Sequence, residues 1–501
     1  MIDRYSKAED YLVNTLEICE EQYCDNKDRS VNQSFQSVIS MDFAKAMRIS
    51  HFKYHNGTFL IFNGVVYRKS PCEGVEALVG DVMERKNYPP LYSVRSRREI
   101  VRHCSSALYR GSFKPDKHLI AFNNVVYDIR AGVTMAHSAD LNVINYLDFE
   151  FNPANTCPKW MQFLREVVES DEKILMLQEY LGAAFIDRSR HKLEKMLFLV
   201  GSGQNGKGVF TNTIRELFGC PKDSSEEEKR DGLVTAFSPQ EIFREGNKQY
   251  MASAINGKLL NICDDMSNQD FSGGDFKKAV AGEPMSARDP YGKPFTVTDM
   301  PLFIASTNEF PKVAQDRTDG NYRRYWVVEF NVKISESQRD PNLKEKLLME
   351  RSGILNWIFA GYKRMIKNGC KFTHSLENEK AVEKLRIAQD SRLQWLQDRE
   401  YSHTQSEGSE RERKNVTELY EDYVKYCKEN NYNAFGRQEF SRRLTQEGFD
   451  KQKSSNNRYF FIWIGGAKFK DDEAEVVVEE KKKIDDIFVP KAMEGFVNLP
   501  F

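Results

Sequence analysis

Short apolar runs and amphipathic stretches alternate in the middle of this chain. The runs at residues 196–200, 259–263 and 300–305 are mainly apolar, as buried strands are. Between the first two runs, residues 209–217 show the spacing of apolar positions that is typical of a helix. Strands that alternate with helices predict an α/β fold for this part of the chain.

The flanking regions have other patterns. Residues 51–69 hold two Asn-Gly turns between aromatic and β-branched residues, which predicts a small β-meander. Two helices, at 416–429 and 437–447, precede a hairpin that ends at residue 464, which is the order of a winged helix. These patterns predict a multidomain chain: a mixed α+β accessory region (1–150), a helical segment (151–195), the α/β domain with a helical lid (196–400), a linker (403–414), the winged helix (410–466) and a charged, disordered tail (467–501).

The first apolar run leads into Gly-Ser-Gly-Gln-Asn-Gly-Lys at residues 201–207, which has the spacing G-x-x-x-x-G-K. Between a strand and a helix this spacing predicts a phosphate-binding loop, because backbone N–H groups and the start of the helix attract phosphate. The lysine would reach the outer phosphates of a nucleotide. The predicted nucleotide contacts are Gly201, Ser202, Gly203, Gln204, Asn205, Gly206, Lys207, Gly208 and Val209.

Gly208 departs from this pattern. A Ser or Thr normally follows the lysine, and its hydroxyl binds Mg²⁺. The alternative interpretation is therefore a structural loop that has lost its ligand. We favour nucleotide binding, because the rest of the predicted site is intact.

Polar residues follow the other apolar runs. Asp264 and Asp265 end the second run, where a phosphate-loop ATPase uses one acid to hold Mg²⁺ through water and the next to activate the attacking water. The third run begins a strand predicted at 300–308, which ends in Asn308, and the amide of Asn308 can orient that water or sense the γ-phosphate. Arg323 and Arg324 precede a further strand, from which an arginine can act across a subunit boundary. Simple turns with surface charges are the alternative.

Basic and aromatic residues alternate between the second and third runs, around a Pro-Tyr-Gly-Lys turn. This composition favours a loop that contacts DNA, although a solvent-exposed hairpin is the alternative. The predicted DNA contacts are Lys277, Lys278, Arg288, Tyr291 and Lys293. The arginines at residues 95–102 fit a solvated helix face or a contact with the DNA backbone.

The composition is that of an ordinary globular protein, with 501 residues, 40% hydrophobic and 29% charged positions, and a net charge of −1. A net charge this close to zero produces no overall electrostatic attraction to DNA, so any DNA binding must use local basic surfaces. We expect no membrane span, because no run of about 18 apolar residues occurs, and no signal peptide, because the first residues have no apolar core. The nine cysteines are scattered, which favours reduced cytosolic thiols over a zinc site.

Taken together, the phosphate loop, the paired acids, Ala305-Ser-Thr-Asn308 and the two arginines follow in a compact order. This order resembles superfamily 3 helicases, the AAA+-type replicative motors of small DNA viruses, phages and plasmids. It is most similar to the phage/plasmid primase-helicase family of the satellite-phage and poxvirus type. The resemblance covers roughly residues 115–464 and includes the stretches at 121–129, 160–164, 177–182 and 353–357.

The resemblance implies an AAA+-type P-loop core, a helical collar for oligomerisation before it and a winged helix after it. It implies a ring-shaped, ATP- and Mg²⁺-dependent helicase, hexameric, that translocates on single-stranded DNA and unwinds forked DNA in phage, plasmid or mobile-element replication. The expected location is the cytoplasm of a bacterial host. Replication proteins are expected partners of the tail.

The resemblance also implies residue roles. Lys207 would hold the phosphates, Asp264 the magnesium and Asp265 the water. Asn308 would be the sensor, and of the two arginines Arg324 is favoured as the finger that acts in trans. The loop around Tyr291 and Lys293 would face the pore. Because residue 208 is a glycine, it is an open question whether any hydroxyl binds magnesium directly.

Two other functions fit the same residues. One is an ATPase that loads or remodels an origin complex without processive unwinding. The other is a structural DNA-binding ring with an inactive nucleotide site, for which Gly208 is the argument. We expect no primase domain, since residues 1–115 lack a paired-acid strand and a zinc-type Cys/His cluster.

Overall fold

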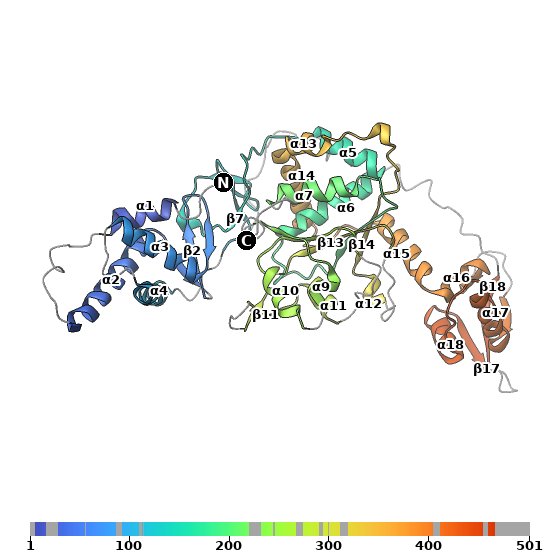
Figure 1. Ribbon diagram of the computed structural model, residues 1–501. Coiled ribbons are helices and arrows are strands. Elements are labelled where there is room, and N and C mark those ends of the chain that lie inside the picture. The colour runs from blue at the N-terminus through green and yellow to red at the C-terminus, as the bar shows by residue number, and fades with distance from the viewer. Residues whose placement is uncertain are drawn as a thin grey trace. The chain divides into compact units, whose positions relative to one another are not determined.

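The computed structural model divides the chain into two compact units, residues 1–385 and 386–501 (Figure 1). It describes residues 6–16, 29–55, 57–86, 93–109, 113, 115–219, 232–243, 246–266, 274–289, 294–298, 300–310, 319–403, 411–453 and 459–465. The predicted tail at 467–501 lies outside these residues, as do Tyr291 and Lys293. The predicted domain boundaries therefore stay predictions.

The first unit begins with a small antiparallel sheet covered by helices. Its strands are β1 (Lys53–His55), β2 (Thr58–Phe62) and β3 (Tyr67–Ser70), in that order, which confirms the predicted meander. The helices are α1 (Ser6–Thr15), α2 (Arg29–Ile49), α3 (Cys72–Arg85) and α4 (Val94–Leu108). A second sheet, in the order β6-β5-β4-β7, consists of β4 (Leu119–Ala121), β5 (Val126–Asp128), β6 (Val133–Met135) and β7 (Asn145–Tyr146).

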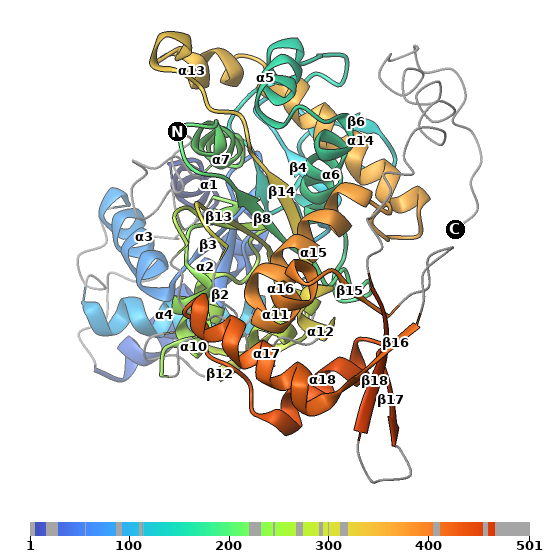
Figure 2. The same ribbon diagram turned by 90° about the vertical axis from the view of Figure 1, so that its right-hand side faces the viewer.

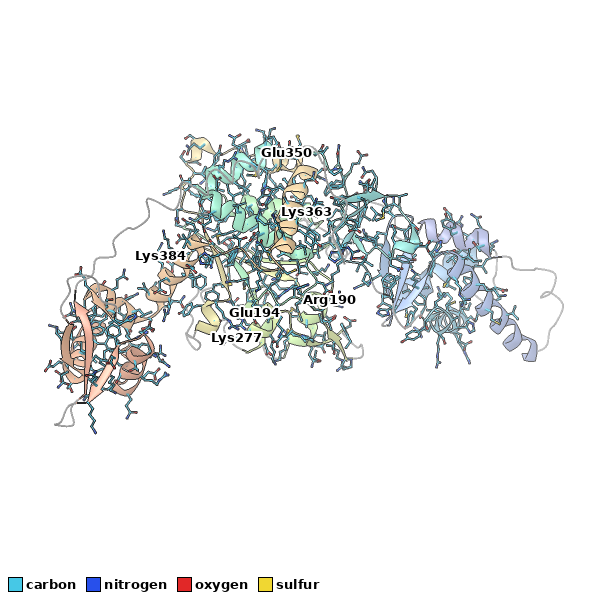
Figure 3. The ribbon with its side chains drawn as sticks, turned by 180° about the vertical axis from the view of Figure 1, so that it is seen from behind. Arg190, Glu194, Lys277, Glu350, Lys363 and Lys384 are labelled. Atoms are coloured by element: carbon cyan, nitrogen blue, oxygen red, sulfur yellow. The ribbon has the colours of Figure 1, made fainter. Side chains whose placement is uncertain are left out.

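Two helices then precede the main sheet, α5 (Pro158–Val168) and α6 (Asp171–Gly182). The carboxylate of Glu350, labelled in Figure 3, accepts hydrogen bonds from the N–H groups of Lys159 and Trp160, at 3.2 and 3.1 Å. These two N–H groups belong to the first turn of α5 and have no partner within the helix. A residue that follows the main sheet in sequence therefore fixes a helix that precedes it.

The main sheet has five strands in the order β14-β8-β13-β10-β9, and every neighbouring pair is parallel. The strands are β8 (Met196–Val200), β9 (Val234–Thr235), β10 (Leu260–Cys263), β13 (Leu302–Thr307) and β14 (Tyr325–Glu329). This sheet confirms the predicted α/β fold and its three apolar strands. The strands are buried on both faces, which is why their sequences are continuous apolar runs.

Helices cover both faces of the sheet (Figures 1 and 2). Leu197 and Leu199 of β8 pack into one core with α5, α6, α7 (Lys207–Leu217) and α14 (Arg351–Lys367). Met196 and Phe198 face a second core. The helices on that side are α9 (Pro239–Phe243), α10 (Lys248–Ala254), α11 (Gly274–Ala281), α12 (Asp319–Tyr322) and α15 (Leu376–Gln389); α13 (Leu343–Leu348) contacts α7.

Between β10 and β13 the chain forms a separate hairpin of β11 (Met285–Arg288) and β12 (Pro294–Val297). Its strands are antiparallel, and Arg288 pairs with Pro294. The predicted contacts Tyr291 and Lys293 lie between these two strands in the sequence and outside the described residues. Strand β11 also packs against α10.

The second unit contains α16 (Ser391–Asp398), α17 (Val416–Glu429), α18 (Arg437–Gln446) and a sheet of β15 (Tyr401–Ser402), β16 (Arg411–Asn415), β17 (Asp450–Lys453) and β18 (Tyr459–Gly465). Strand β18 pairs antiparallel with each of the others. Helices α17 and α18 confirm the two predicted helices. The prediction of a linker at 403–414 is wrong for residues 411–414, because they belong to β16 of this sheet.

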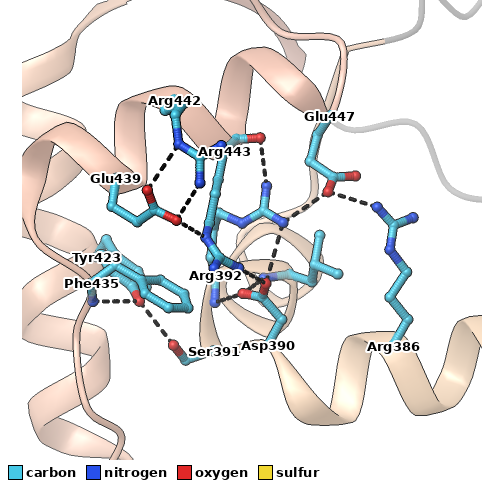
Figure 4. A network of polar contacts seen from close by, with 11 residues as sticks. Arg386, Asp390, Ser391, Arg392, Tyr423, Phe435, Glu439, Arg442, Arg443 and Glu447 are labelled. Atoms are coloured by element: carbon cyan, nitrogen blue, oxygen red, sulfur yellow. Dashed lines mark hydrogen bonds and ion pairs between the residues drawn. The ribbon is translucent and has the colours of Figure 1, made fainter. Parts of the chain in front are cut away.

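Buried charges connect the helices of this unit (Figure 4). The guanidinium of Arg392, with a side chain only 3% exposed, lies 2.8 Å from a carboxylate oxygen of Glu447 and 3.4 Å from one of Asp390. Arg443 lies 2.6 Å from Glu439 and 3.4 Å from Asp390. These bonds fix α18 against the start of α16.

Candidate functional site

The loop from 201 to 206 joins β8 to α7 at the carboxyl edge of the main sheet. Gly203, Gln204 and Gly206 have positive φ angles of 92, 53 and 87°, and Gly206 is the N-cap of α7. A Cβ atom on Gly206 would lie within 3.0 Å of Val167, and one on Gly201 within 3.0 Å of Phe330 and Asn205. The loop thus needs glycine at 201 and 206, and it leads directly into the N-terminus of α7.

The side chain of Asn205 anchors this loop. It is 3% exposed, and its Nδ2 donates to the carbonyl of Phe330 at 3.0 Å. The carbonyl of Gln204 accepts from the N–H of Ile334 at 2.8 Å. The loop is therefore bonded to the segment that follows β14, the neighbour of β8.

Lys207 is the first residue of α7 and is only 6% exposed. Its ammonium donates to the carbonyl of Gly201 and to Oδ1 of Asn205, the latter at 3.3 Å. Burial lowers the pKa of this ammonium, and the nearby carboxylate of Asp265 opposes that shift. The charge of Asp265 therefore acts on the ammonium of Lys207, and the roles predicted for both residues stay predictions.

The two acids after β10 have different neighbours. Oδ2 of Asp264 lies 3.0 Å from Nη2 of Arg215, which also donates to the carbonyl of Ile262. Oδ1 of Asp264 is buried and has no hydrogen-bond partner among the described residues. Asp265 has a φ angle of 55°, in the left-handed region that Asp tolerates better than most residues. Asp264 is therefore paired with Arg215, whereas Asp265 acts on Lys207 through its charge.

Asn308 follows β13, which pairs with both β8 and β10. The carbonyl of Thr307 accepts from the N–H of Gly201 at 3.2 Å, and that of Ser306 from the N–H of Met266 at 2.9 Å. The end of β13 therefore joins the phosphate loop to the turn that carries the acids. Asn308 is exposed at this same edge of the sheet.

The two arginines lie at the opposite edge, at the amino end of β14. Arg324 accepts a hydrogen bond from the N–H of Met196 at its carbonyl, at 2.8 Å. Its side chain is 9% exposed and lies 3.8 Å from Glu194, which Figure 3 labels. The side chain of Arg323 is 60% exposed and lies 3.1 Å from the same glutamate. The arginines are thus far from their own phosphate loop along the strands, and Arg324 is buried in its own chain.

Three of the five predicted DNA contacts are described by the structure, and they belong to other elements than the strand ends above. Lys277, labelled in Figure 3, and Lys278 belong to α11, and Arg288 is an exposed residue at the end of β11. Tyr291 and Lys293 lie outside the described residues. Among the described residues no helix is both long and apolar enough to cross a membrane.

Two family models match parts of this chain. Residues 51–169 match the family described as "D5 N terminal like". Residues 199–324 match a family of unknown function, DUF5906, and this segment runs from the end of β8 to Arg324. All the predicted nucleotide-binding and catalytic residues fall within the second match, whose description names no activity.

Among solved structures, the chain is similar to two apo structures of the C-terminal region of NrS-1. Identity is 12% in both, and the TM-score is 0.46. The alignments cover 85% and 84% of this chain and 98% of each NrS-1 chain. At these values the likeness carries no assignment of its own.

Sequence reasoning did not find Arg215. It lies eight residues after Lys207, with Thr211 midway, so the three residues share one face of α7. All three are buried, at 6%, 0% and 6% exposure for Lys207, Thr211 and Arg215. A basic residue at this helical spacing from the lysine was the available signal.

Proposed function

We propose that this chain is an ATP-dependent DNA helicase of the superfamily 3 type, whose parallel sheet forms an AAA+-like P-loop core. The observation that carries the proposal is the shared edge of three parallel strands. The phosphate loop follows β8, the paired acids follow β10 and Asn308 follows β13, which lies between them. This is the set of groups that phosphoryl transfer requires: a phosphate cradle, acids and a polar residue beside the attacking water.

Phosphate binding rests on the loop and on Lys207. The N–H groups at the start of α7 and the positive end of its dipole attract phosphate oxygens. Lys207 would exchange its bonds to Gly201 and Asn205 for bonds to the outer phosphates. Because its partners belong to the same loop, this exchange requires only a short movement of the ammonium group.

Asp264 fits a magnesium site, because its Oδ1 is buried without a partner among the described residues. A bound Mg²⁺ ion would neutralise charge on the phosphates. Asp265, beside Lys207, would accept a proton from the attacking water, and Asn308 would orient that water. No side chain extends from Gly208, so Asp264, water and phosphate oxygens remain as ligands.

An arginine would complete the site from a neighbouring subunit. Arg323 suits this role better than Arg324, because its side chain is exposed while that of Arg324 is buried against Glu194. We therefore revise the choice of Arg324 that the resemblance suggested. The position of both residues, at the edge opposite the phosphate loop, is consistent with action across a subunit boundary in a ring.

DNA would be bound by the β11–β12 hairpin and by the second unit. The hairpin carries Arg288, and Tyr291 and Lys293 follow β11 in the sequence, so cationic and aromatic groups would meet a single strand. The second unit has the element order of a winged helix, with α16 and β16 before α17 and α18 and a β17–β18 hairpin after them. The match to the D5 N terminal like family adds support from outside the ATPase residues.

The test is ATP hydrolysis with and without single-stranded DNA, together with separation of a forked duplex. We expect DNA to stimulate hydrolysis, and Lys207→Ala to lower turnover by about 10²-fold or more, as loss of a charge-stabilising donor does. Circular dichroism would verify that the variant is folded. Near wild-type turnover in folded Lys207→Ala would refute the assignment, and hydrolysis without strand separation would favour the remodelling ATPase.

A further inference from the structure

Arg215 is a buried cation with two partners at the carboxyl end of β10. It lies on α7, on the face that Lys207 and Thr211 share. Its Nη2 donates to the carbonyl of Ile262 and lies 3.0 Å from Oδ2 of Asp264, while its own side chain is 7% exposed. The guanidinium thus joins the helix that begins at the phosphate loop to the strand that ends in the acids.

This contact leaves the two oxygens of Asp264 in unequal states. Oδ2 is bonded to Arg215, whereas Oδ1 is buried with no partner among the described residues. A buried carboxylate oxygen gains stability from a partner, so Oδ1 is the oxygen that is open to a further ligand. The cation beside Oδ2 holds the direction of the carboxylate, because rotation would break this ion pair.

We propose that Arg215 is a positioning residue for the metal: it holds Oδ2 of Asp264 so that Oδ1 is available to a divalent cation bound with the nucleotide. This inference rests on the proposed function, since it assumes that a metal–nucleotide complex binds at the phosphate loop. Outer partners of ligating carboxylates typically contribute 10–100-fold to metal affinity or activity. Because residue 208 is a glycine and offers no hydroxyl ligand, metal affinity would depend more strongly on the orientation of Asp264.

The experiment separates metal binding from nucleotide binding. Mn²⁺ binding would be followed by electron paramagnetic resonance in the presence of ADP, and a fluorescent ADP would be titrated in EDTA. In Arg215→Met we expect Mn²⁺ affinity to fall by about 10–100-fold, and ADP binding in EDTA to change by less than about threefold. The Mn²⁺ affinity of Arg215→Lys should lie between those of the wild type and Arg215→Met, because an ammonium can keep one of the two contacts of the guanidinium.

A matched control lies at the next position of α7. Glu216 pairs with Lys344 of α13 at 2.7 Å, so Glu216→Gln breaks an ion pair of the same helix that does not involve the acids. Its Mn²⁺ affinity should equal that of the wild type. If Arg215→Met instead acted by loosening α7, it would weaken ADP binding in EDTA as much as it weakens Mn²⁺ binding, and this result would overturn the proposal.

A double-mutant cycle gives a second test. Asp264→Asn should weaken Mn²⁺ binding, and adding Arg215→Met or Arg215→Lys to it should have little further effect, because the arginine acts through the carboxylate. Additive losses, or wild-type Mn²⁺ affinity in a folded Arg215 variant, would overturn the role of Arg215 alone. A wild-type protein that binds neither ADP nor Mn²⁺–ADP would instead overturn the proposed function.

Discussion

Gly208 occupies an ordinary helical position that has room for a side chain. Its φ angle is not in the left-handed region, and a Cβ atom there would meet no heavy atom within 4 Å. The two glycines that the loop needs for close approach are 201 and 206 instead. A serine at 208 would therefore keep the backbone of α7 and add the hydroxyl that phosphate loops normally have.

We predict that Gly208→Ser keeps ATPase turnover within about threefold of the wild type and lowers the Mg²⁺ concentration for half-maximal rate, since each added ligand bond stabilises the bound metal. Steady-state rates across a magnesium titration would measure both quantities. Loss of turnover with an unchanged helical spectrum would show that the site excludes a hydroxyl.

Lys195, the residue before β8, gives a prediction about pH. Burial, with Arg323 as a second cause, lowers its pKa from 10.5 to about 8. Between these values the unfolded chain binds more protons at this position than the folded chain, so this residue makes stability rise with pH. Lys195→Met should therefore lose stability relative to the wild type as pH rises from 8 to 10.5.

Thermal unfolding of Lys195→Met and the wild type at several pH values would measure this difference. Lys384→Met is a suitable control, because Lys384 pairs with Glu329 at 3.0 Å but is 72% exposed. The control should show no comparable trend. A constant difference between Lys195→Met and the wild type over the whole range would contradict the prediction.

At the scale of elements, α6 and α14 approach each other through glycines. A Cβ atom on Gly182 would lie within 3.0 Å of the backbone of Tyr362, and one on Gly361 within 3.0 Å of the backbone of Gln178. Backbone atoms cannot move aside as a flexible side chain can. The helix before the main sheet and the helix after it are thus in direct backbone contact.

We predict that Gly361→Ala destabilises the first unit by about 1–3 kcal/mol, the usual cost of overpacking. A shift of roughly 2–4 °C in Tm per kcal/mol is expected for a domain of 150–250 residues. Gly436→Ala, where a Cβ atom meets nothing within 4 Å, is the control. Equal Tm values for Gly361→Ala and the wild type would mean that the helices can separate at no cost.

The sequence predicts buried elements better than charged ones. Strands β8, β10 and β13 are apolar because helices cover both of their faces, so their patterns alone were sufficient. Strand β16 has the sequence Arg-Glu-Arg-Lys-Asn, and only its pairing with β18 makes it a strand. A local pattern cannot predict such a strand, because the hydrogen bonds come from residues about 50 positions later in the chain.

The same limit applies to the site. Lys207 follows from a motif with a fixed spacing, and the acids follow from their place at the end of an apolar strand. The ion pair of Arg215 with Asp264, and the burial of Arg324 against Glu194, depend on which strands are neighbours. The order β14-β8-β13-β10-β9 determines both, and no spacing in the sequence encodes it. The roles assigned to these residues stay predictions.

At the scale of the whole molecule, an arginine that acts on the site of a neighbouring subunit can be tested by mixing two inactive variants. Asp265→Asn subunits lack the acid but keep Arg323, and Arg323→Ala subunits lack the arginine but keep the acid. Neither alone should turn over, because an arginine finger contributes about 10³–10⁵ in rate. In mixed rings some sites have both groups, so ATPase activity should reappear and peak at an intermediate ratio.

Sedimentation would verify that mixed rings form before rates are measured. Arg324→Ala provides the comparison, because it removes a buried side chain whose partners are in the same chain. We expect it to lower Tm, and mixing should not restore its stability. No recovery with Arg323→Ala at any ratio, in verified mixed rings, would exclude Arg323 as the finger.

Strand β8 has the phosphate loop at one end and the Glu194–arginine cluster at the other. Its five residues span about 17 Å, at roughly 3.3 Å per residue. Parallel pairing with both β13 and β14 and nearly complete burial leave it no room to bend. In a ring, such a strand would move as a rigid body, so that a displacement of the phosphate loop would also displace the arginine cluster. The order in which the subunits hydrolyse ATP would then follow from this rigid connection, with no other element needed to couple the sites.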